Sequence, residues 1–487
     1  MSVTSALSSA LSGLSANARQ AEILSSNVAN ATTPGYARRE VGLSAAVLAG
    51  TGQGVQVLGV TRDVDRHLLG ERRLAEAAGA DRDLRAEFLK RVEQTLGTPD
   101  SPGSLAARLA AFDQALVEAA GRPESEARLG NIAATARSLA AGLAAATTDI
   151  QAARATADRQ IADEVGKLNA TLGQLHDLNV ELRSFSGAGR DVSALLDQRQ
   201  RLVDQIAAIV PIREVPRDLN QIALYTTGGA PLLDGSAAVF GFSATHTITP
   251  EMTQALGGLS GITINGRPYD TAGSASPILG GTLGALFALR DEMAVTAQGK
   301  LDAAARDLME RFASAGLDPS LAPGAPGLFT DAGQAFDPLT EAGLAGRLRL
   351  NAAADPLQGG ALFRLRDGLG AAVAGPPGNG TLLSALHGAL TGARPLSSAG
   401  FVAGTRSFAM LTGDLMSDAS AARLSAQSEQ SFAAAKLTAL GDLEDQNGID
   451  TDREMQELLV IEKNYAANAK VIQAVADMID TLIRLDG

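Results

Sequence analysis

Residues 451–485 read TDREMQELLVIEKNYAANAKVIQAVADMIDTLIRL and carry a seven-residue repeat of mostly apolar side chains. Two positions of the repeat, three residues apart, form the seam. One is occupied by Leu458, Tyr465, Ile472 and Ile479, and the other by Ile461, Asn468, Val475 and Leu482. A repeat of this period predicts an α-helix whose seam packs against a partner helix. Asp450 or Thr451 can cap the start, Glu454 can complete a capping box, and Arg484 suits the negative end of the helix dipole. We therefore expect a long helix that requires a partner.

A second seam lies at the other end of the chain. It consists of Leu7, Leu11, Leu14, Ala18, Ala21 and Val28. The helix that it predicts ends at the Thr33-Pro34-Gly35 turn, so the two chain ends are expected to pair with each other. Asn468, inside the C-terminal seam, would lower the stability of that pairing but fix its register. The alternative is that each seam belongs to an ordinary amphipathic core helix.

Composition excludes several classes of protein. With 487 residues the chain is long enough for about three domains, and its net charge of −13 argues against nucleic acid or an anionic membrane as the main partner. The absence of cysteine excludes disulfides, thiolate metal sites and cysteine nucleophiles. No cleaved secretory signal and no membrane-spanning run is expected. Aromatic residues make up 3% of the chain, which favours long helices that pack through small side chains.

The order of elements predicts a mainly α fold with inserted β-structure. Helical composition over residues 124–185 predicts a helix of about 60 residues, or ~90 Å. Short strands are expected at 222–226, 239–242 and 262–264, with a hairpin turn at Asn265-Gly266. The expected segments are an N-terminal helix with an extended stretch (1–70), a long helical domain (71–210), a β-rich insertion (211–280), a returning helix (281–315), an irregular segment (316–400), and a C-terminal long helix with the coiled-coil helix (401–487).

We find no constellation of residues that indicates catalysis or a cofactor. The four histidines, His67, His176, His246 and His387, lack metal-ligand spacing, and no hydrolase or phosphate-binding motif occurs. The glycine run at residues 50–54 is interpreted as structural because no strong strand precedes it and no helix follows it. Residues 443–454 are spaced like a calcium loop, but Leu443 stands where the first carboxylate is needed. The sequence predicts a protein that is not an enzyme and has no metal or cofactor.

Short strings at both ends resemble one protein family. GLSA at residues 13–16, SNVAN at 26–30 and TPGY at 33–36 resemble the N-terminal signature of the flagellar rod, hook and hook-associated proteins, and YAANA at 465–469 resembles their terminal segment. In that family the termini pack as coiled coils that line the inner tube. NGIDTD at 447–452 and EKN at 462–464 depart from the usual pattern but leave the seven-residue repeat intact.

The long helical stretch and the strings RDVDRHL (62–68), DVSALLDQR (191–199) and GTLGAL (281–286) are similar to the members that join hook to filament. This resemblance implies a structural subunit of the bacterial flagellum, secreted through the flagellar type III apparatus and polymerised through its terminal helices. The implied partners are other copies of the chain, hook protein, hook-associated protein 3 and an export chaperone. The alternatives are another axial protein, such as hook-associated protein 3 itself, or a soluble coiled-coil scaffold. The residues expected at the subunit interface are Leu7, Leu11, Leu14, Asn27, Val28, Asn30, Tyr36, Leu458, Ile461, Tyr465, Asn468, Ile472, Val475, Ile479 and Leu482.

Overall fold

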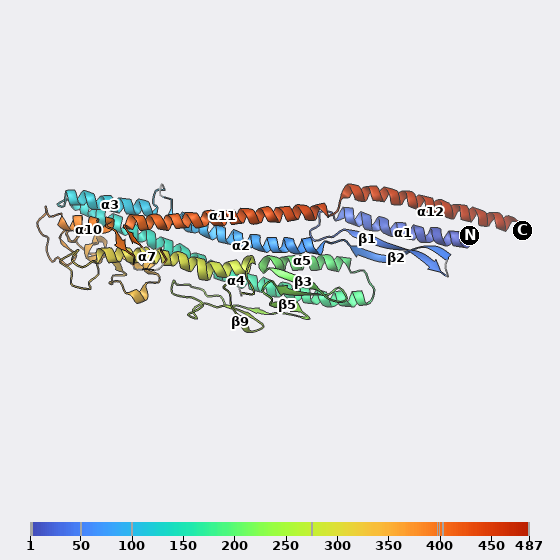
Figure 1. Ribbon diagram of the computed structural model, residues 1–487, viewed down its shortest axis with the longest axis horizontal. Helices are drawn as coiled ribbons and strands as arrows, with labels where there is room; N and C mark the ends of the chain where they lie inside the picture. The colour runs from blue at the N-terminus through green and yellow to red at the C-terminus, as the bar shows by residue number, and fades with distance from the viewer. Residues whose placement is uncertain are drawn as a thin grey trace. The chain divides into compact units, whose positions relative to one another are not determined.

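The computed structural model describes residues 3–48, 51–98, 101–273, 276–396, 398, 400–401 and 404–485 (Figure 1). The chain forms two units, each assembled from segments that are far apart in the sequence. The terminal unit contains residues 1–79, 167–239 and 433–487, and the central unit contains residues 80–166 and 240–432. Three long helices contribute residues to both units, because the chain passes from one unit to the other within each of them.

The expected mainly α fold is confirmed, and most predicted helices are observed within a few residues of their predicted ends. The helices are α1 (Val3–Ala29), α2 (Arg66–Leu96), α3 (Leu105–Gly121), α4 (Glu126–Gly187), α5 (Ser193–Ile209), α6 (Gly281–Ala288), α7 (Ala294–Phe312), α8 (Leu344–Arg347), α9 (Phe363–Asp367), α10 (Thr381–Thr391), α11 (Phe408–Gln446) and α12 (Thr451–Leu485). The returning helix is interrupted by a π-helical turn, Leu289–Met293, between α6 and α7.

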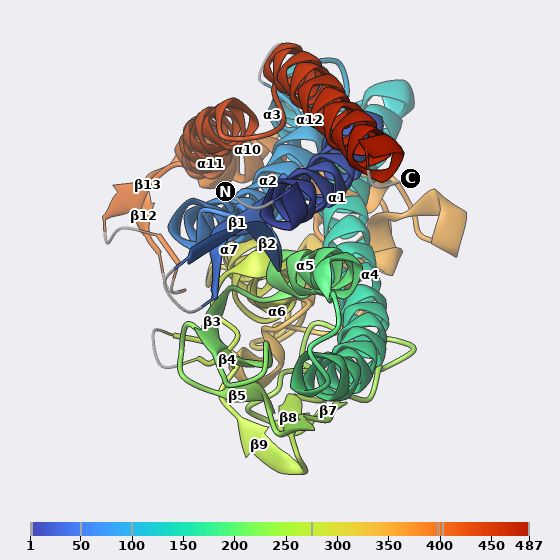
Figure 2. The same cartoon turned by 90° about the vertical axis from the view of Figure 1, so that its right-hand side faces the viewer.

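In the terminal unit α1 lies between α12 and a β-hairpin (Figures 1 and 2). The hairpin consists of β1 (Arg39–Leu48) and β2 (Thr51–Arg62), and the sequence analysis missed its first strand. A four-stranded antiparallel sheet follows α5, formed by β3 (Ile212–Pro216), β4 (Ile222–Thr226), β5 (Pro231–Asp234) and β6 (Ser236–Ala237). Asn179 on α4 bonds to both the N–H and the C=O of Ile222, which fixes the start of β4 against that helix.

The central unit has an aromatic core in which Phe112, Phe312 and Phe329 make mutual ring contacts with centroids 5.4–5.9 Å apart. Its strands are short, and they pair as three small antiparallel sheets. These strands are β7 (Phe240–Gly241), β8 (Ile262–Ile264), β9 (Arg267–Tyr269), β10 (Phe329–Asp331), β11 (Leu348–Leu350), β12 (Arg394–Pro395) and β13 (Thr405–Arg406).

The strands expected together over residues 211–280 are observed as two separate sheets, one in each unit. The physical reason is that each sheet buries its own apolar side chains. Leu224 and Leu232 are buried in the terminal unit, whereas Ile262 and Ile264 are buried in the central unit. Composition alone shows where short strands occur, but it does not show which core they cover.

Two buried polar clusters hold the loops of the central unit to its helices. The side chain of Arg154, which is 1% exposed, donates to the backbone carbonyls of Thr249, Met252 and Arg290. Asp302 on α7 accepts hydrogen bonds from the backbone N–H groups of Gly343 and Ala345. Burial raises the pKa of Asp302 to about 6, although these N–H donors oppose the shift.

Candidate assembly site at the chain ends

The two terminal helices pair with each other in an antiparallel arrangement. Asn27 of α1 contacts Glu454 of α12, and fourteen residues further along each helix an added Cβ at Gly13 would lie 2.8 Å from Nδ2 of Asn468. The absence of a side chain at Gly13 therefore lets the two helices approach closely where the seam carries its polar residue. The expected pairing of the chain ends is observed.

Asn27 is the polar centre of this contact. Its side chain is fully buried, and all four of its hydrogen-bonding positions are used. Nδ2 donates to the carbonyl of Arg39 (2.9 Å) and to a carboxylate oxygen of Glu454 (2.8 Å), while Oδ1 accepts from the N–H of Arg39 (3.0 Å) and the hydroxyl of Tyr36 (3.1 Å). One amide thus connects α1, the segment that leads into β1, and α12.

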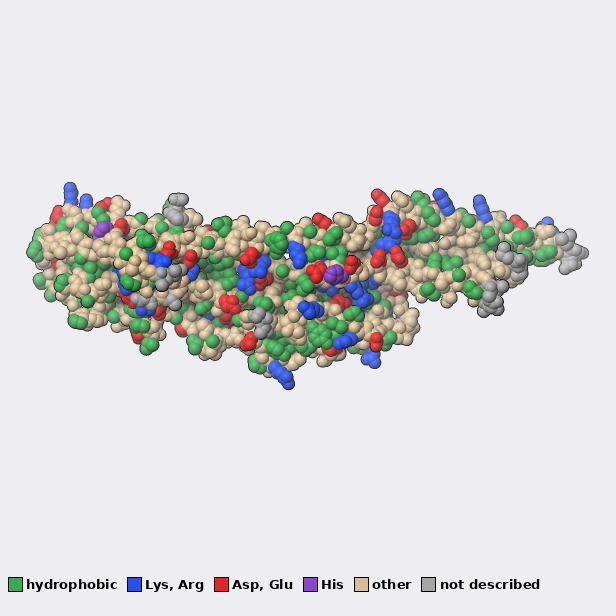
Figure 3. All heavy atoms as spheres, viewed as in Figure 1, with side chains coloured by type: hydrophobic (Ala, Val, Ile, Leu, Met, Phe, Trp, Pro, Cys, Tyr) green, Lys and Arg blue, Asp and Glu red, His purple; other side chains and the backbone are tan. Residues whose placement is uncertain are grey.

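Glu454 completes the connection with a charge pair. Its carboxylate is 1% exposed and accepts a 2.5 Å hydrogen bond from Nε of Arg38. Burial lowers the pKa of Arg38, but the bonds and charges of Glu454 and Glu40 outweigh this effect and leave the pKa raised. Acidic and basic side chains gather on the surface where α12 begins (Figure 3).

The capping role predicted for Glu454 is wrong, because Asn27 and Arg38 occupy its carboxylate. Of the two predicted candidates for the cap itself, Asp450 is the one observed, since its side chain accepts from the N–H groups of Asp452 and Arg453. Spacing within one helix indicated Glu454 for a capping box, and it could not reveal that two residues from the other end of the chain engage its carboxylate.

A second charge cluster fixes the hairpin to α5. Asp197 is 4% exposed and binds Arg39 (2.5 Å) from the start of β1 and Arg62 (2.8 Å) from the end of β2. The Arg39 guanidinium also lies 4.5 Å from the centre of the Tyr36 ring. Burial lowers the pKa of Arg62, and Asp197 offsets only part of that shift. The sequence analysis assigned no role to these charged residues.

The C-terminal seam is covered along only part of its length. Ile461 and Val475 are buried, and Leu458, Asn468 and Ile472 are half-buried, whereas Tyr465, Ile479 and Leu482 are 47%, 39% and 58% exposed. The antiparallel register explains the two exposed residues near the C-terminal end. Continuing it places Val3, the first described residue of α1, opposite Met478, so α12 extends past the described part of its partner.

The predicted N-terminal seam is only partly buried within the chain. Leu11 is 62% exposed, and Leu7, Leu14 and Val28 are only half-buried. The buried face of α1 instead carries Ala10, Ala16, Asn17, Ile23, Leu24 and Asn27. Small residues occupy much of this face because α1 is covered by α12 on one side and by the hairpin on another. Asn30 is half-buried and donates to the carbonyl of Ser26 in the turn after α1.

The glycine-rich run has the structural role that was expected. Gly54 has a positive φ of 103°, and a Cβ at this position would lie 2.0 Å from the hydroxyl oxygen of Ser12 on α1. The same hydroxyl accepts a hydrogen bond from the N–H of Val55. Only glycine allows the hairpin to pack this closely on α1. Gly50 of the run lies outside the described residues.

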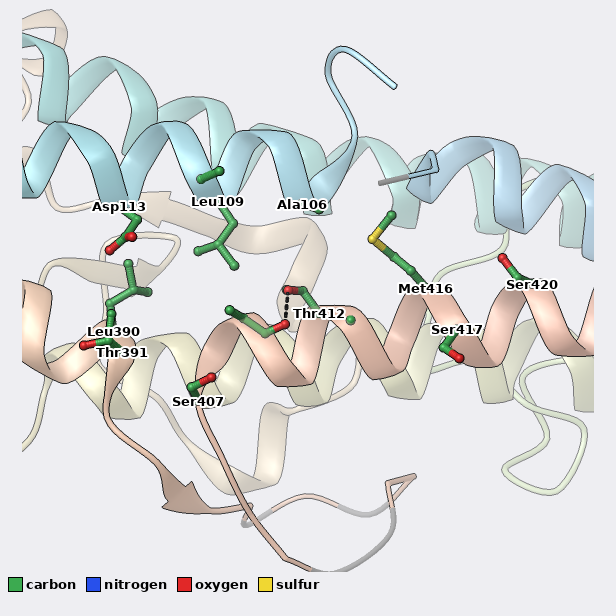
Figure 4. Close-up of a pocket in the computed structure, with 13 residues that line it drawn as sticks. Ala106, Leu109, Asp113, Leu390, Thr391, Ser407, Thr412, Met416, Ser417 and Ser420 are labelled. Atoms are coloured by element: carbon green, nitrogen blue, oxygen red, sulfur yellow. Dashed lines mark hydrogen bonds between the residues drawn. The ribbon is translucent and has the colours of Figure 1, made fainter. Parts of the chain in front are cut away.

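The central unit contains a hollow of about 500 Å³ between α3, α10 and α11 (Figure 4). Leu109 and Met416 reach into it, and Asp113 lies 3.2 Å from Nε2 of His387. The nearby hydroxyls of Thr391 and Thr412 donate to backbone carbonyls of their own helices. Among the described residues, no hydroxyl group that lines the hollow forms a hydrogen bond with this imidazole.

No helix in the described part of the chain is both long and apolar enough to cross a membrane. In the same ranges, no cluster of three or more histidine, aspartate or glutamate side chains has an arrangement that could hold a metal ion.

Three sequence families match successive parts of the chain. The family described as Flagella basal body rod protein matches residues 7–36, Flagellar hook-associated protein FlgK helical domain matches residues 89–324, and Flagellar basal body rod FlgEFG protein C-terminal matches residues 445–485. The two terminal matches cover α12 and most of α1, and the central match contains all of α4 together with α3, α5, strands β3–β9, α6 and α7.

Individual relatives agree with these matches. Flagellar hook-associated protein 1 of Salmonella typhimurium is 26% identical over 48% of this chain and 44% of the relative. The protein of the same name from Bacillus subtilis is 26% identical over 42% of this chain and 43% of the relative. The chain thus spans less than half the length of these relatives. The flagellar hook junction protein FlgK from Burkholderia pseudomallei superimposes with a TM-score of 0.45 and 20% identity, over 54% of this chain and 46% of that protein.

Proposed function

Because the chain belongs to the family of flagellar axial proteins that includes hook-associated protein 1, we propose that it is a structural subunit at the junction between hook and filament. In this proposal it is exported through the flagellar type III apparatus, lies outside the cell as part of the flagellum, and polymerises through its terminal helices. It has no catalytic role.

The observation that carries the proposal is the uncovered part of the α12 seam. Ile479, Leu482 and Ile483 are exposed beyond the described part of α1, although their spacing is that of a helix seam. Complete burial of a fully exposed leucine or isoleucine contributes roughly 1.5–3 kcal/mol, and covering these partly exposed side chains would contribute a fraction of that. A polymer in which a neighbouring copy covers these residues would gain this free energy at each contact, whereas the single chain leaves it unused.

A neighbouring face of α12 extends the exposed apolar surface. Val460, Val471 and Met478 are 43–56% exposed, and their spacings of eleven and seven residues place them on one side of the helix. Leu11 of α1 and Tyr465 of α12 are exposed as well. We propose that the fifteen residues predicted for the subunit interface act in two ways: the buried ones pair the chain ends, and the exposed ones contact other copies.

The proposed partners follow from the family. They are further copies of this chain, hook protein on one side, hook-associated protein 3 on the other, and an export chaperone before assembly. Hook-associated protein 3 as the identity of this chain is less favoured, because the family match over residues 89–324 is to the FlgK helical domain.

The test is to delete the gene in the bacterium that encodes the chain, and to examine the cells by electron microscopy while assaying flagellin in the culture medium. We expect hooks without filaments and flagellin lost to the medium, with both defects reversed when the wild-type chain is restored. Normal filaments on the deletion strain would refute the junction role. A stable homodimer of the purified protein that ignores hook ends would then favour the soluble scaffold.

A further inference from the structure

A cavity of about 770 Å³ lies within the terminal unit, and none of its lining residues belongs to α1 or α12. Its walls come from the end of β2, the first two turns of α2, α5 and β3. This volume is within the range of protein sites that bind small ligands. Its charged lining consists of Arg62, Arg66, His67, Glu71, Arg73, Arg199, Arg213 and Glu214. Five arginines in one cavity are unexpected in a chain with a net charge of −13.

Two of the five arginines are already neutralised. Arg62 binds Asp197, and Arg73 donates to Asp204 (2.7 Å) and Glu214 (2.8 Å). These pairs fix the positions of two guanidinium groups on the wall of the cavity. The other three arginines take no part in these pairs.

The other three arginines have no carboxylate partner among the described residues. Arg199 is half-buried and donates to the backbone carbonyl of Asn220, and Arg66 and Arg213 form no ion pair in the described ranges. The lining offers one further carboxylate, that of Glu71. Three guanidinium groups against one carboxylate leave the cavity positively charged.

The pKa of Arg199 also indicates an excess of positive charge in the cavity. Burial lowers the pKa of Arg199 to about 10, Glu214 opposes the shift, and the neighbouring Arg62 and Arg66 add to it. The first turn of α5 also lines the cavity and contributes the positive end of its helix dipole. An anion bound here would relieve the repulsion among the arginines, and guanidinium groups bind carboxylate and phosphate oxygens in a bidentate geometry.

We propose that this cavity binds an oxyanion ligand that carries more than one carboxylate or phosphate group. The size of the cavity and the three arginines without a carboxylate partner favour such a ligand over a single small ion. The ligand's source is either a free polyanion or an acidic segment of protein.

A segment with suitable chemistry exists in the chain itself, since residues 442–452 contain five carboxylates and no basic side chain. Within it, Asp442, Asp445 and Asp452 are exposed and form no ion pair among the described residues.

The proposal is tested by titrating the purified full-length monomer in a calorimeter with three probes at low ionic strength. The probes are pyrophosphate, citrate and a synthetic peptide of residues 440–453. The informative variant combines Arg66→Gln with Arg213→Gln. Both side chains are exposed and make no ion pair with described residues, so the fold should survive, and circular dichroism verifies this. The matched control is Arg183→Gln, which removes an exposed arginine of the same unit outside the cavity.

We expect saturable one-to-one binding that weakens as salt is added, is at least tenfold weaker in the double variant, and is unchanged in the control. Binding of pyrophosphate or citrate would assign a free anion, and binding of the peptide alone would assign a protein segment. The proposal is overturned if none of the probes binds saturably, or if the double variant binds as tightly as the wild type. Because the monomer is measured, the outcome is independent of the proposed junction role.

Discussion

Replacing Asn27 by alanine should release α12 from α1. The substitution removes four hydrogen bonds, of which three join neutral groups and one joins the charged Glu454. A neutral hydrogen bond contributes about 1 kcal/mol and one to a charged group about 2 kcal/mol, so the loss is at most about 5 kcal/mol. Arg38 remains on Glu454, and water can enter the vacated space, so we expect a loss of about 3–4 kcal/mol.

Amide hydrogen exchange of the monomer measures this loss where it occurs. Since each 1.4 kcal/mol is a tenfold factor, amides in the covered part of α12 should exchange about 100- to 700-fold faster in the variant. Asn30→Ala is the control, because Asn30 bonds only within the turn after α1 and its loss should cost no more than about 1 kcal/mol. Equal exchange rates of α12 in Asn27→Ala and the wild type would refute the role assigned to Asn27.

Three other substitutions probe buried polar groups. The pKa of Asp302, about 6, lies above its value of about 4 in an unfolded chain, so its contribution to the free energy of unfolding should fall by about 2–3 kcal/mol as pH rises from 4 to 6. Asp302→Asn should abolish that part of the pH dependence, and denaturant unfolding at several pH values measures the difference; identical profiles would contradict the assignment. Arg154→Met should destabilise the central unit by about 3–5 kcal/mol, because one buried and two partly buried carbonyls lose their donor, and urea unfolding should detect this loss. Asn17→Leu should raise the stability of the terminal unit by about 1–2 kcal/mol, because the buried Nδ2 of Asn17 has no hydrogen-bond partner; a lower melting temperature would count against this reading.

Periodicity predicted the helices well because it is a local property. The seven-residue repeat predicted α12 over residues 451–485, which are the observed bounds. The first strand of the hairpin was missed although a signal was present. Val41, Leu43, Ala45 and Val47 alternate with other residues, which is a strand pattern, although Leu43 and Val47 are exposed in the observed strand.

The candidate site was less predictable because its contacts join distant segments. Glu454 and Arg38 are separated by more than 400 residues, and no spacing rule connects them. On α1 the leucines predicted the buried face, whereas close packing against two neighbours buries a face with small residues such as Ala10 and Gly13. A pattern of large apolar residues indicates which face of a helix packs against another element, but it does not show whether that element belongs to the same chain.

The central claim is that the uncovered end of the α12 seam joins one copy to the next. It is tested most directly by restoring the deletion strain with the double variant Ile479→Ser and Leu482→Ser, with Asp480→Ser as the control. Asp480 is exposed on the same turn of α12 but lies outside the seam. We predict that the double variant is exported into the medium while the cells carry hooks without filaments, and that the control restores filaments. Normal filaments on cells that carry the double variant would contradict the account.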